Sequence, residues 1–461
     1  MNSLKRFYSW PFVWVALAVF IGHYFSEIER SGEPKRKHQP IYWDAISYYA
    51  YLPATFIHGD LSMSFTKTAD YGQYFWPEAT PGGGLISKTT MGIAYLYAPF
   101  FFAAHAYAHY TDYAADGFSK PYQFAIQLSG LVYGLLGLLL MGVVLRRYFG
   151  AAVVSCTLVC FALGTNLFNY MTHEAAMSHA FNFFAIALFV WLTEYWHQKP
   201  SVMRTFGLGL CLGLITLIRP TNLLVVLVPL LYGYGGPHFK ARWQAIRQHP
   251  QWLVYLAFGA FLVGFPQLLY WKTYTGQWLY FSYTGERFFW SKPMWIDFLF
   301  SYRKGWLLYS PLLILALLGL FMQHQANRHY RLPSLILLPL LIYMLSCWWA
   351  WWFGGGFGSR PMVDWYPLLM IPFAVMLQWA FRRFWASLVL LLLLPAVVDL
   401  SLAQQFQYKH GIMHYDSMSK QAYWAIFYNK PVPADFESLI MPPDYTLNLE
   451  GGREKLERIF D

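Results

Sequence analysis

Long apolar stretches recur along most of the chain and alternate with short polar segments. A membrane-spanning helix needs about 20 mostly apolar residues, and a tilted or broken helix needs fewer. Eleven stretches meet this requirement, at roughly residues 9–25, 122–145, 151–169, 176–195, 205–219, 221–236, 252–270, 306–322, 333–349, 366–381 and 385–400. The pattern predicts an all-α polytopic membrane protein with about 11 transmembrane helices within residues 1–400.

A further apolar run, from Met91 to His109, is long enough to cross, but counting it would invert every later loop. If this run stays on the outer side, six basic clusters lie in the cytoplasm, where Lys and Arg are favoured. These clusters are Lys5/Arg6, Arg146/Arg147, Lys199/Arg204, Lys240/Arg242/Arg247, Arg328/Arg331 and Arg382/Arg383. Lys35, Arg36 and Lys37 then lie outside, in a loop long enough to be exempt from this rule. We expect a long outer loop over residues 26–121 with juxtamembrane helices, and an irregular or partly ordered outer tail over 401–461.

Composition agrees with a membrane protein, because 57% of the residues are hydrophobic and only 12% are charged. The net charge of +10 lies in short clusters between apolar runs rather than on one basic face, so we predict no nucleic-acid partner. The four cysteines fall in or beside apolar segments, which argues against a disulfide framework. The first apolar run has no small-residue cleavage site, so we expect a retained helix.

The first candidate for chemistry is Asp44, in a short helix expected over residues 41–53 and halted near Pro53. At about 100° per residue, Asp44 shares one face with Ser47, Tyr48 and Tyr51. Asp44 is either a functional carboxylate or a solvated residue that caps an interfacial helix.

The second candidate is the outer loop at 169–179, which contains His173 and Glu174. If Thr172 caps the next helix, Glu174, Ser178 and Asn182 follow at i, i+4 and i+8. Such a polar stripe should face the bundle interior or a wet cavity. The alternative is a glutamate favoured by the helix dipole. A zinc-protease motif is excluded, because His179 lies six residues after His173 and not four.

The third candidate is the glycine-rich sequence at 351–361, in which Arg360 follows four glycines. Exposed backbone N–H groups beside an arginine make a phosphate-binding loop. A flexible turn with a headgroup-binding arginine is the alternative. Further outer cations are either snorkelling anchors or, as a set, ligands for an anionic lipid carrier. They are Lys88, Arg219, Arg287, Arg303 and Lys304.

Taken together, the acid in the first long loop, the acid in the second outer loop, the apolar run after Lys88 and the Phe-Gly-Ser-Arg-Pro turn resemble the glycosyltransferase C superfamily. The likeness covers about residues 1–400 and is greatest to bacterial relatives of protein O-mannosyltransferases and the lipid A aminoarabinose transferase. It implies Asp44 as catalytic base or acceptor-orienting group, Glu174 as the second acid with His173 beside it, and Lys88 as a phosphate ligand. Many relatives place a second acid beside the first-loop Asp, or an Asp in the second loop, whereas here Asp44 is alone and the second loop has His173-Glu174.

The resemblance implies transfer of a sugar from a polyprenyl-phosphate carrier to an acceptor hydroxyl, on the periplasmic side of a bacterial inner membrane. The expected donor-phosphate ligands are Lys88, Arg219, Arg303, Lys304 and Arg360, and the expected substrate-lining residues are Tyr48, Tyr51, Ser178 and Asn182. The acceptor is a glycan, a lipid or a protein, and we expect no metal ligands or other cofactor, although a need for a divalent metal stays open. A transporter or flippase and a polysaccharide polymerase or ligase are the competing functions.

Overall fold

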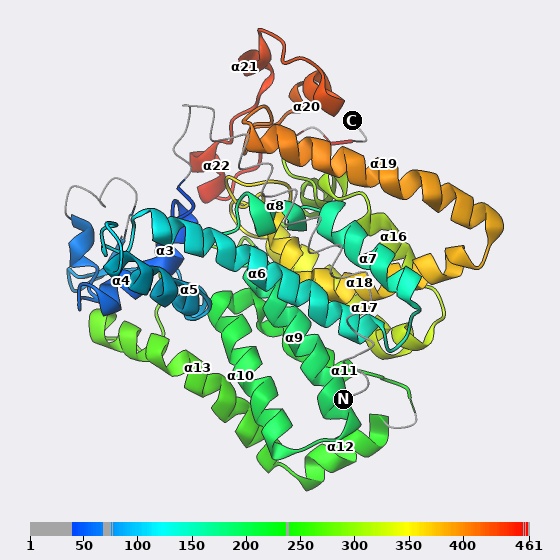
Figure 1. The fold of residues 1–461 in the computed structure, drawn as a ribbon, viewed down its shortest axis with the longest axis horizontal. Coiled ribbons are helices and arrows are strands. Elements are labelled where there is room, and N and C mark those ends of the chain that lie inside the picture. The colour runs from blue at the N-terminus through cyan, green and yellow to red at the C-terminus, as the bar shows by residue number, and fades with distance from the viewer. Residues whose placement is uncertain are drawn as a thin grey trace.

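The structure, a computed structural model, describes residues 39–67, 75, 77–236, 239–454, 456 and 458–459. Helix makes up 66% and strand 2%, which confirms a helical fold. Figure 1 shows long helices that fan out from a central group, with short elements of the first loop at one edge and the C-terminal segment at another. The first predicted crossing, at 9–25, and the cluster at 35–37 lie outside the described residues.

The part of the first loop that the structure describes folds into short elements and one long helix. They are α3 (Asp44–Tyr49), α4 (Tyr51–Phe56), η2 (Ser64–Lys67), the antiparallel pair β1 (Glu78–Ala79) and β2 (Leu85–Ile86), and α5 (Gly92–His109). The single helix expected over residues 41–53 is divided at Ala50 into α3 and α4, and α4 runs past Pro53 to Phe56. Pro53 is the third residue of α4, where its missing N–H costs no intrahelical hydrogen bond.

The central helices follow in chain order. They are α6 (Lys120–Leu145), α7 (Ala151–Leu163), α8 (Leu167–Thr172), α9 (Ser178–Gln198), α10 (Val202–Ile218), η3 (Pro220–Val226), α11 (Leu227–Leu231), α12 (Phe239–Gln248), α13 (Gln251–Thr275), α14 (Trp295–Phe300), α15 (Trp306–Tyr309), α16 (Leu313–Gly319), α17 (Gln325–Ser346), η4 (Arg360–Trp365), α18 (Tyr366–Phe381) and α19 (Phe384–Lys409).

Within the described residues, four helices are long and apolar enough to cross a membrane: α6, α13, α17 and α19. Several other predicted crossings are shorter or divided. The run at 221–236 forms η3 and α11, and the run at 306–322 is split between α15 and α16. Proline explains the second break, since Ser310, the residue before Pro311, has φ −140° and ψ 62° and leaves the helix.

Both ends of α5 lie beside helix ends that the charge pattern assigns to the outer side. At its start, Met91 N donates to Gln267 Oε1 of α13 at 2.9 Å, and Thr90 Oγ1 donates to Leu217 O of α10. Near its end, His105 Nδ1 is hydrogen-bonded to Tyr122 Oη in the first turn of α6. Both ends of α5 therefore lie beside helix ends that the charge pattern predicts on one side, and the exclusion of α5 from the crossings stays a prediction.

Glycines bring α10 and α13 into direct backbone contact. A Cβ added to Gly209 would lie 2.2 Å from Leu256 O, and one added to Gly213 would lie 2.7 Å from Ala260 O. From the other helix, a Cβ on Gly259 would lie 2.7 Å from Phe206 O. Small residues that let two backbones approach in this way are typical of helix pairs in membranes.

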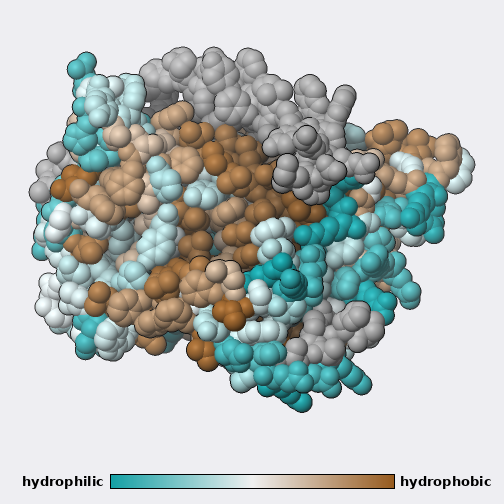
Figure 2. All heavy atoms as spheres, turned by 60° about the horizontal axis from the view of Figure 1, so that its bottom comes forward, coloured by the Kyte–Doolittle hydropathy of each residue, from teal (hydrophilic) through white to brown (hydrophobic). Residues whose placement is uncertain are grey.

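Two of the long apolar helices have little protein around them. In their most apolar stretches only 11% of α13 and 17% of α19 is buried. Figure 2 shows apolar surface across the middle of one face, bounded by hydrophilic residues toward the lower right. An apolar surface of this extent suits contact with lipid.

The C-terminal segment is more ordered than the sequence predicts. Helix α19 runs to Lys409, beyond the expected boundary at 401, because glutamines in its last turns find buried partners: Gln404 Nε2 donates to Tyr423 Oη at 2.6 Å, and Gln407 Nε2 to Ile426 O at 2.6 Å. Four short helical elements follow: α20 (Lys420–Ile426), η5 (Phe427–Asn429), α21 (Phe436–Leu439) and α22 (Tyr445–Leu449).

Candidate functional site

The acid of the first loop meets the glycine-rich loop, although 316 residues separate them in sequence. Asp44 is the first residue of α3, and Arg360 is the first residue of η4. Arg360 Nη2 donates to Asp44 Oδ2 at 2.9 Å, with the arginine side chain 13% exposed and the aspartate side chain 46% exposed. A carboxylate held by a largely buried cation and half open to solvent can meet a ligand at this surface.

Arg360 retains its charge in spite of burial. Burial opposes the charged form, but Asp44, followed by Tyr170 and Tyr48, outweighs burial and raises the pKa of the guanidinium. Its Nε is buried and has no hydrogen-bond partner among the described residues. This N–H is one of the five donors of the guanidinium, and no group of the described residues uses it.

Tyr48 lies one turn after Asp44 on the same helix and is buried. Burial raises the pKa of its phenol and Asp44 raises it further, whereas Arg219 and Arg360 lower it. All three charged groups therefore lie within electrostatic reach of one hydroxyl. This environment brings Arg219 to the same site as Asp44 and Arg360.

The other three predicted lining residues have different surroundings. Tyr51 Oη donates to Thr89 O at 2.6 Å, so it joins α4 to the following loop. Asn182 Nδ2 donates to Asp364 Oδ2 at 3.0 Å in the interior. Ser178 is buried beside Tyr48, and a side-chain hydrogen bond from Ser178 acts to lower the pKa of the Tyr48 phenol.

The glycine-rich loop gains its shape from left-handed backbone at several residues, among them Gly356 with φ +146°. A Cβ at Gly356 would lie 2.9 Å from Tyr170 Oη, 3.3 Å from Arg360 Cδ and 3.7 Å from Lys304 Nζ. The missing side chain thus lets three functional side chains converge. The Phe357 N–H, which the sequence offers to a phosphate, donates to Tyr170 Oη at 3.0 Å.

Lys304 is a buried lysine that faces this loop. Its Nζ donates to Gly354 O at 2.7 Å. Burial, followed by the charge of Arg360, lowers the pKa of Lys304 to about 7, although Glu174 and Asp416 act in the opposite direction. Lys304 therefore lies among the predicted site residues, as a cation that is readily deprotonated.

Glu174 lies in the turn before α9 and not within that helix, which begins at Ser178. The predicted stripe with Ser178 and Asn182 is therefore interrupted. Asn169 Nδ2 donates to Glu174 Oε2 at 2.8 Å, and Tyr408 Oη donates to Oε1 at 2.7 Å. Its orientation is thus fixed by a helix from the far end of the chain.

His173 lies next to this acid. The centroid of its ring is 5.9 Å from the centroid of the Tyr408 ring, in an edge-on arrangement. The structure thus places both second-loop candidates beside Tyr408, and Glu174 also acts electrostatically on Lys304 and Arg360.

Asp364 is a fully buried acid that the sequence analysis did not single out. His179 Nδ1 lies 3.0 Å from its Oδ1, and Asn182 and Asn222 donate to its Oδ2 at 3.0 and 2.8 Å. Arg219 Nε lies 3.8 Å from the same oxygen. One carboxylate thereby connects α9, η3 and the arginine near Tyr48.

Lys88 is engaged by an acid from another loop. Its Nζ forms an ion pair with Glu286 Oε1 and lies 5.1 Å from the centroid of the Tyr283 ring. Glu286 Oε2 also accepts from Trp349 Nε1 at 2.9 Å. A phosphate ligand at Lys88 has to compete with Glu286.

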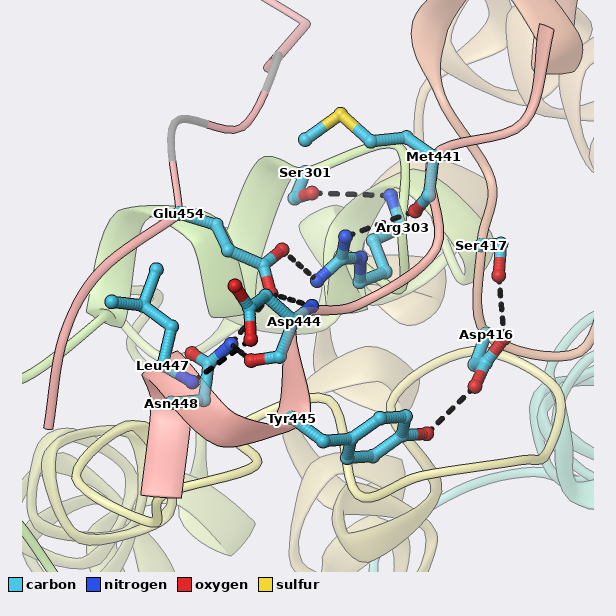
Figure 3. Close-up of polar contacts among 10 residues, drawn as sticks. All are labelled: Ser301, Arg303, Asp416, Ser417, Met441, Asp444, Tyr445, Leu447, Asn448 and Glu454. Carbon is cyan, nitrogen blue, oxygen red and sulfur yellow. Dashed lines mark hydrogen bonds and ion pairs between the residues drawn. The ribbon is translucent and has the colours of Figure 1, made fainter. Parts of the chain in front are cut away.

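Arg303 holds the C-terminal segment through its two terminal nitrogens (Figure 3). Its Nη1 lies 2.6 Å from Glu454 Oε2, and its Nη2 donates to Met441 O at 3.1 Å. The same Glu454 accepts from Asp444 N and from Asn448 Nδ2, both at 2.5 Å. The structure therefore indicates an architectural role for Arg303, where the sequence predicted phosphate binding.

Two of the overlooked residues left a signal in the sequence. Asp364 follows Arg360 by four residues, and Glu286 precedes Arg287, so each acid stands near a cation already under consideration. Tyr170, Asn222 and Tyr408 left none, because a tyrosine or asparagine in an apolar run is equally compatible with simple packing. Their roles depend on contacts between distant segments.

The groups described above support acid–base and anion-binding chemistry. In the part of the chain that the structure describes, no three His, Cys, Asp or Glu side chains are grouped so as to hold a metal ion. The charged groups instead form acid–cation pairs around Tyr48 and Gly356.

Comparisons with protein-family models, with curated proteins and with solved structures give no match for this chain. The functional argument therefore depends on the geometry of these residues.

Proposed function

We propose that the chain is a membrane glycosyltransferase of the glycosyltransferase C type. It moves a sugar from a polyprenyl-phosphate carrier to an acceptor hydroxyl at the outer face of the membrane. The observation that carries the proposal is the contact of Asp44 with Arg360, because it joins a half-exposed base to a phosphate-binding cation. Arg219 and Lys304 supply further positive charge at the same site.

The proposed reaction divides the site into two parts. Asp44 accepts the proton of the acceptor hydroxyl while that oxygen attacks the anomeric carbon. The bond from the anomeric carbon to the phosphate oxygen breaks, and the carrier phosphate leaves with the electron pair. Arg360 stabilises the departing charge through its free Nε–H, and Arg219 does so through its free Nη1–H.

The proposed setting is a bacterial inner membrane, with about eleven crossings and the site on the periplasmic side. The four long apolar helices support membrane insertion, and two of them, α13 and α19, are mostly not covered by other parts of the protein. A carrier lipid keeps its tail in the bilayer while its phosphate reaches the interface, so a site at helix ends and outer loops suits this substrate. The acceptor, whether a glycan, a lipid or a protein, stays open.

A transporter for a lipid-linked or anionic substrate is the second candidate. It is favoured by the fully buried Asp364, which faces His179 and Asn182 on α9. Ionisable groups in a helix bundle are typical of substrate pathways. A transporter moves the labelled lipid across vesicles unchanged, whereas a transferase yields a new glycosidic product.

Asp44→Asn tests the proposed function. Purified protein is incubated with sugar-labelled polyprenyl-phosphate lipids and a membrane extract as acceptor, and transfer to lipid, glycan and protein fractions is measured. Since a general base contributes about 10²–10⁴-fold, Asp44→Asn should lose at least about a hundredfold of the transfer rate.

The matched control is Asp112→Asn, an exposed acid of the same outer loop, which should retain wild-type transfer. Elution as a single species in detergent establishes that both variants are folded. Full activity of a folded Asp44→Asn variant would exclude the base assignment, and vesicle transport without any new product would favour the transporter.

A further inference from the structure

Asp364 is placed where a charge is costly. Its side chain is fully buried near the end of η4, just before α18, and an unpaired carboxylate there would be strongly destabilising. Three neutral side chains compensate by hydrogen bonding: His179 and Asn182 from α9, and Asn222 from η3. Its hydrogen bonds are thus supplied without Arg219.

Arg219 lies at the break between α10 and η3. It precedes Pro220, and its backbone is extended, with φ −150° and ψ 109°. Asn222 N donates to Arg219 O at 2.9 Å, so both residues belong to one turn. Asp364 contacts this turn at two points. It accepts a hydrogen bond from Asn222, and its carboxylate lies near Arg219 Nε.

The 3.8 Å distance from Arg219 Nε to Asp364 Oδ2 is an ion pair without a hydrogen bond. The attraction orients the guanidinium and leaves its donors unused. Arg219 Nη1 is buried and has no partner among the described residues. His179, which shares Asp364 with Arg219, has its ring centroid 4.8 Å from that of Tyr170. The Tyr170 hydroxyl in turn lies at Gly356, beside Arg360. These contacts place Arg219 next to the candidate site, and its charge also acts on Tyr48.

We infer that Asp364 is a positioning residue for the donor phosphate: it never touches the lipid, but its charge holds Arg219 with Nη1–H toward the phosphate. This inference rests on the proposed function. It predicts that Asp364 affects donor binding only when Arg219 is present.

Asp364→Asn is a suitable variant because it can preserve the hydrogen bonds and remove the charge. The amide oxygen can accept from Asn182 and Asn222, and the amide nitrogen can donate to His179 Nδ1 if the imidazole proton moves to Nε2. His179 Nε2 is buried and has no partner among the described residues, so this change of tautomer breaks no existing bond.

The experiment measures binding of a synthetic polyprenyl monophosphate without sugar in detergent micelles. The proteins are wild type, Asp364→Asn, Arg219→Ala and the double variant. Asp364→Asn should weaken binding about tenfold, the scale of one charged contact. The double variant should bind no more weakly than Arg219→Ala, because interacting residues are not additive.

Glu194→Gln is the matched control. Like Asp364, Glu194 is a buried acid, but it lies on α9 and contacts Arg147, Tyr148 and Tyr330. It lies 15 residues after His179, about 22 Å along the helix. Glu194→Gln should lower thermal stability and leave polyprenyl-phosphate affinity unchanged.

Additive losses in the double variant, or unchanged binding by a folded Asp364→Asn variant, would overturn the positioning role and leave the proposed function intact. If the wild-type protein does not bind polyprenyl monophosphate, both the positioning role and the proposed function are rejected. If Asp364→Asn does not fold, Asp364→Glu is tested in the same cycle, since it keeps the charge but moves it by one methylene. Equal losses with and without Arg219 would again reject the inference.

Discussion

At the scale of single residues, each site cation has a nearby acid. Arg360 is opposed by Asp44, Arg219 by Asp364, and Lys88 by Glu286. These three acid–cation pairs are therefore close to neutral, and a phosphate gains most from N–H donors without partners. This places Arg219 and Arg360 ahead of Lys88 as phosphate ligands.

Lys304 provides a prediction for pH dependence. Its pKa of about 7 lies below the ordinary value of 10.5, with burial the main cause and Arg360, Glu174, Asp416 and Arg303 the charged neighbours. The protonated form binds an anion, so affinity for polyprenyl phosphate should fall about tenfold between pH 6 and pH 8. Between pH 7 and 10.5 Lys304 is protonated in the unfolded chain and largely deprotonated in the folded protein. The contribution of Lys304 to the free energy of unfolding therefore rises with pH in this range.

Lys304→Met should remove that pH dependence of binding. Lys272→Met, at an exposed lysine that donates to Gly276 O, should retain it and serves as the control. A wild-type affinity that is constant from pH 6 to pH 8 would contradict the role of Lys304.

The sequence predicted which residues meet better than it predicted how each is used. The sequence analysis expected Asp44, Glu174 and Arg360 on one side, and the structure brings Asp44 into contact with Arg360, on which Glu174 also acts electrostatically. The use of Arg303 was not predictable, since Glu454 lies far along the chain and the tail shows no periodic pattern. Likewise, Asn182 was predicted to line the substrate because it follows Glu174 and Ser178 at helical spacing, and that spacing does not reveal its bond to Asp364, 182 residues further along the chain.

At the scale of helices, the contact of α10 with α13 gives a stability prediction. Gly209→Ala places a Cβ 2.2 Å from Leu256 O, and a backbone oxygen cannot rotate away. We expect a loss of about 1–3 kcal/mol, typical of overpacking, measured as a lower midpoint of thermal unfolding in detergent.

Gly207→Ala is the control on the same helix, because its added Cβ meets nothing within 4 Å. Alanine is the better helix former by up to about 1 kcal/mol, so this variant should match or exceed wild-type stability. Equal midpoints for the two variants would mean that the helices separate more easily than the contact indicates.

Hydropathy located most helices but not their ends. The apolar stretch at 385–400 is a helix that continues to Lys409, because Gln404 and Gln407 satisfy their amides on the C-terminal segment. Conversely, Pro311 divides the run at 306–322. Side-chain hydrogen bonding and proline change helix length without changing mean hydropathy.

At the scale of the whole molecule, the outer placement of α5 is open to direct measurement. If α5 does not cross, Lys67→Cys and Asp112→Cys should both react with a membrane-impermeant thiol reagent in intact cells. Gln248→Cys, in α12, should react only after the membrane is opened. All three positions are exposed, and Cys156, Cys160, Cys211 and Cys347 are replaced first.

Labelling of positions 67 and 112 from opposite sides would make α5 a crossing and invert the later loops. The loop of Arg360 would then lie on the opposite side of the membrane from Asp44, which would contradict the contact between these two residues. Hydropathy alone could not decide this, because the run from Met91 to His109 is long enough to cross, and only the positions of Lys and Arg favour leaving it outside.

The docking of the C-terminal segment has a consequence for biogenesis. Lys292 Nζ donates to Gly451 O at 2.7 Å, and Arg458 Nε donates to Asp297 Oδ1 at 2.7 Å, beside the pairing of Arg303 with Glu454. The loop that carries Lys304 is therefore secured by residues that leave the ribosome after every long helix. A partly synthesised chain has its helices but not this clamp, so the nascent protein acquires its complete site as a last step of assembly.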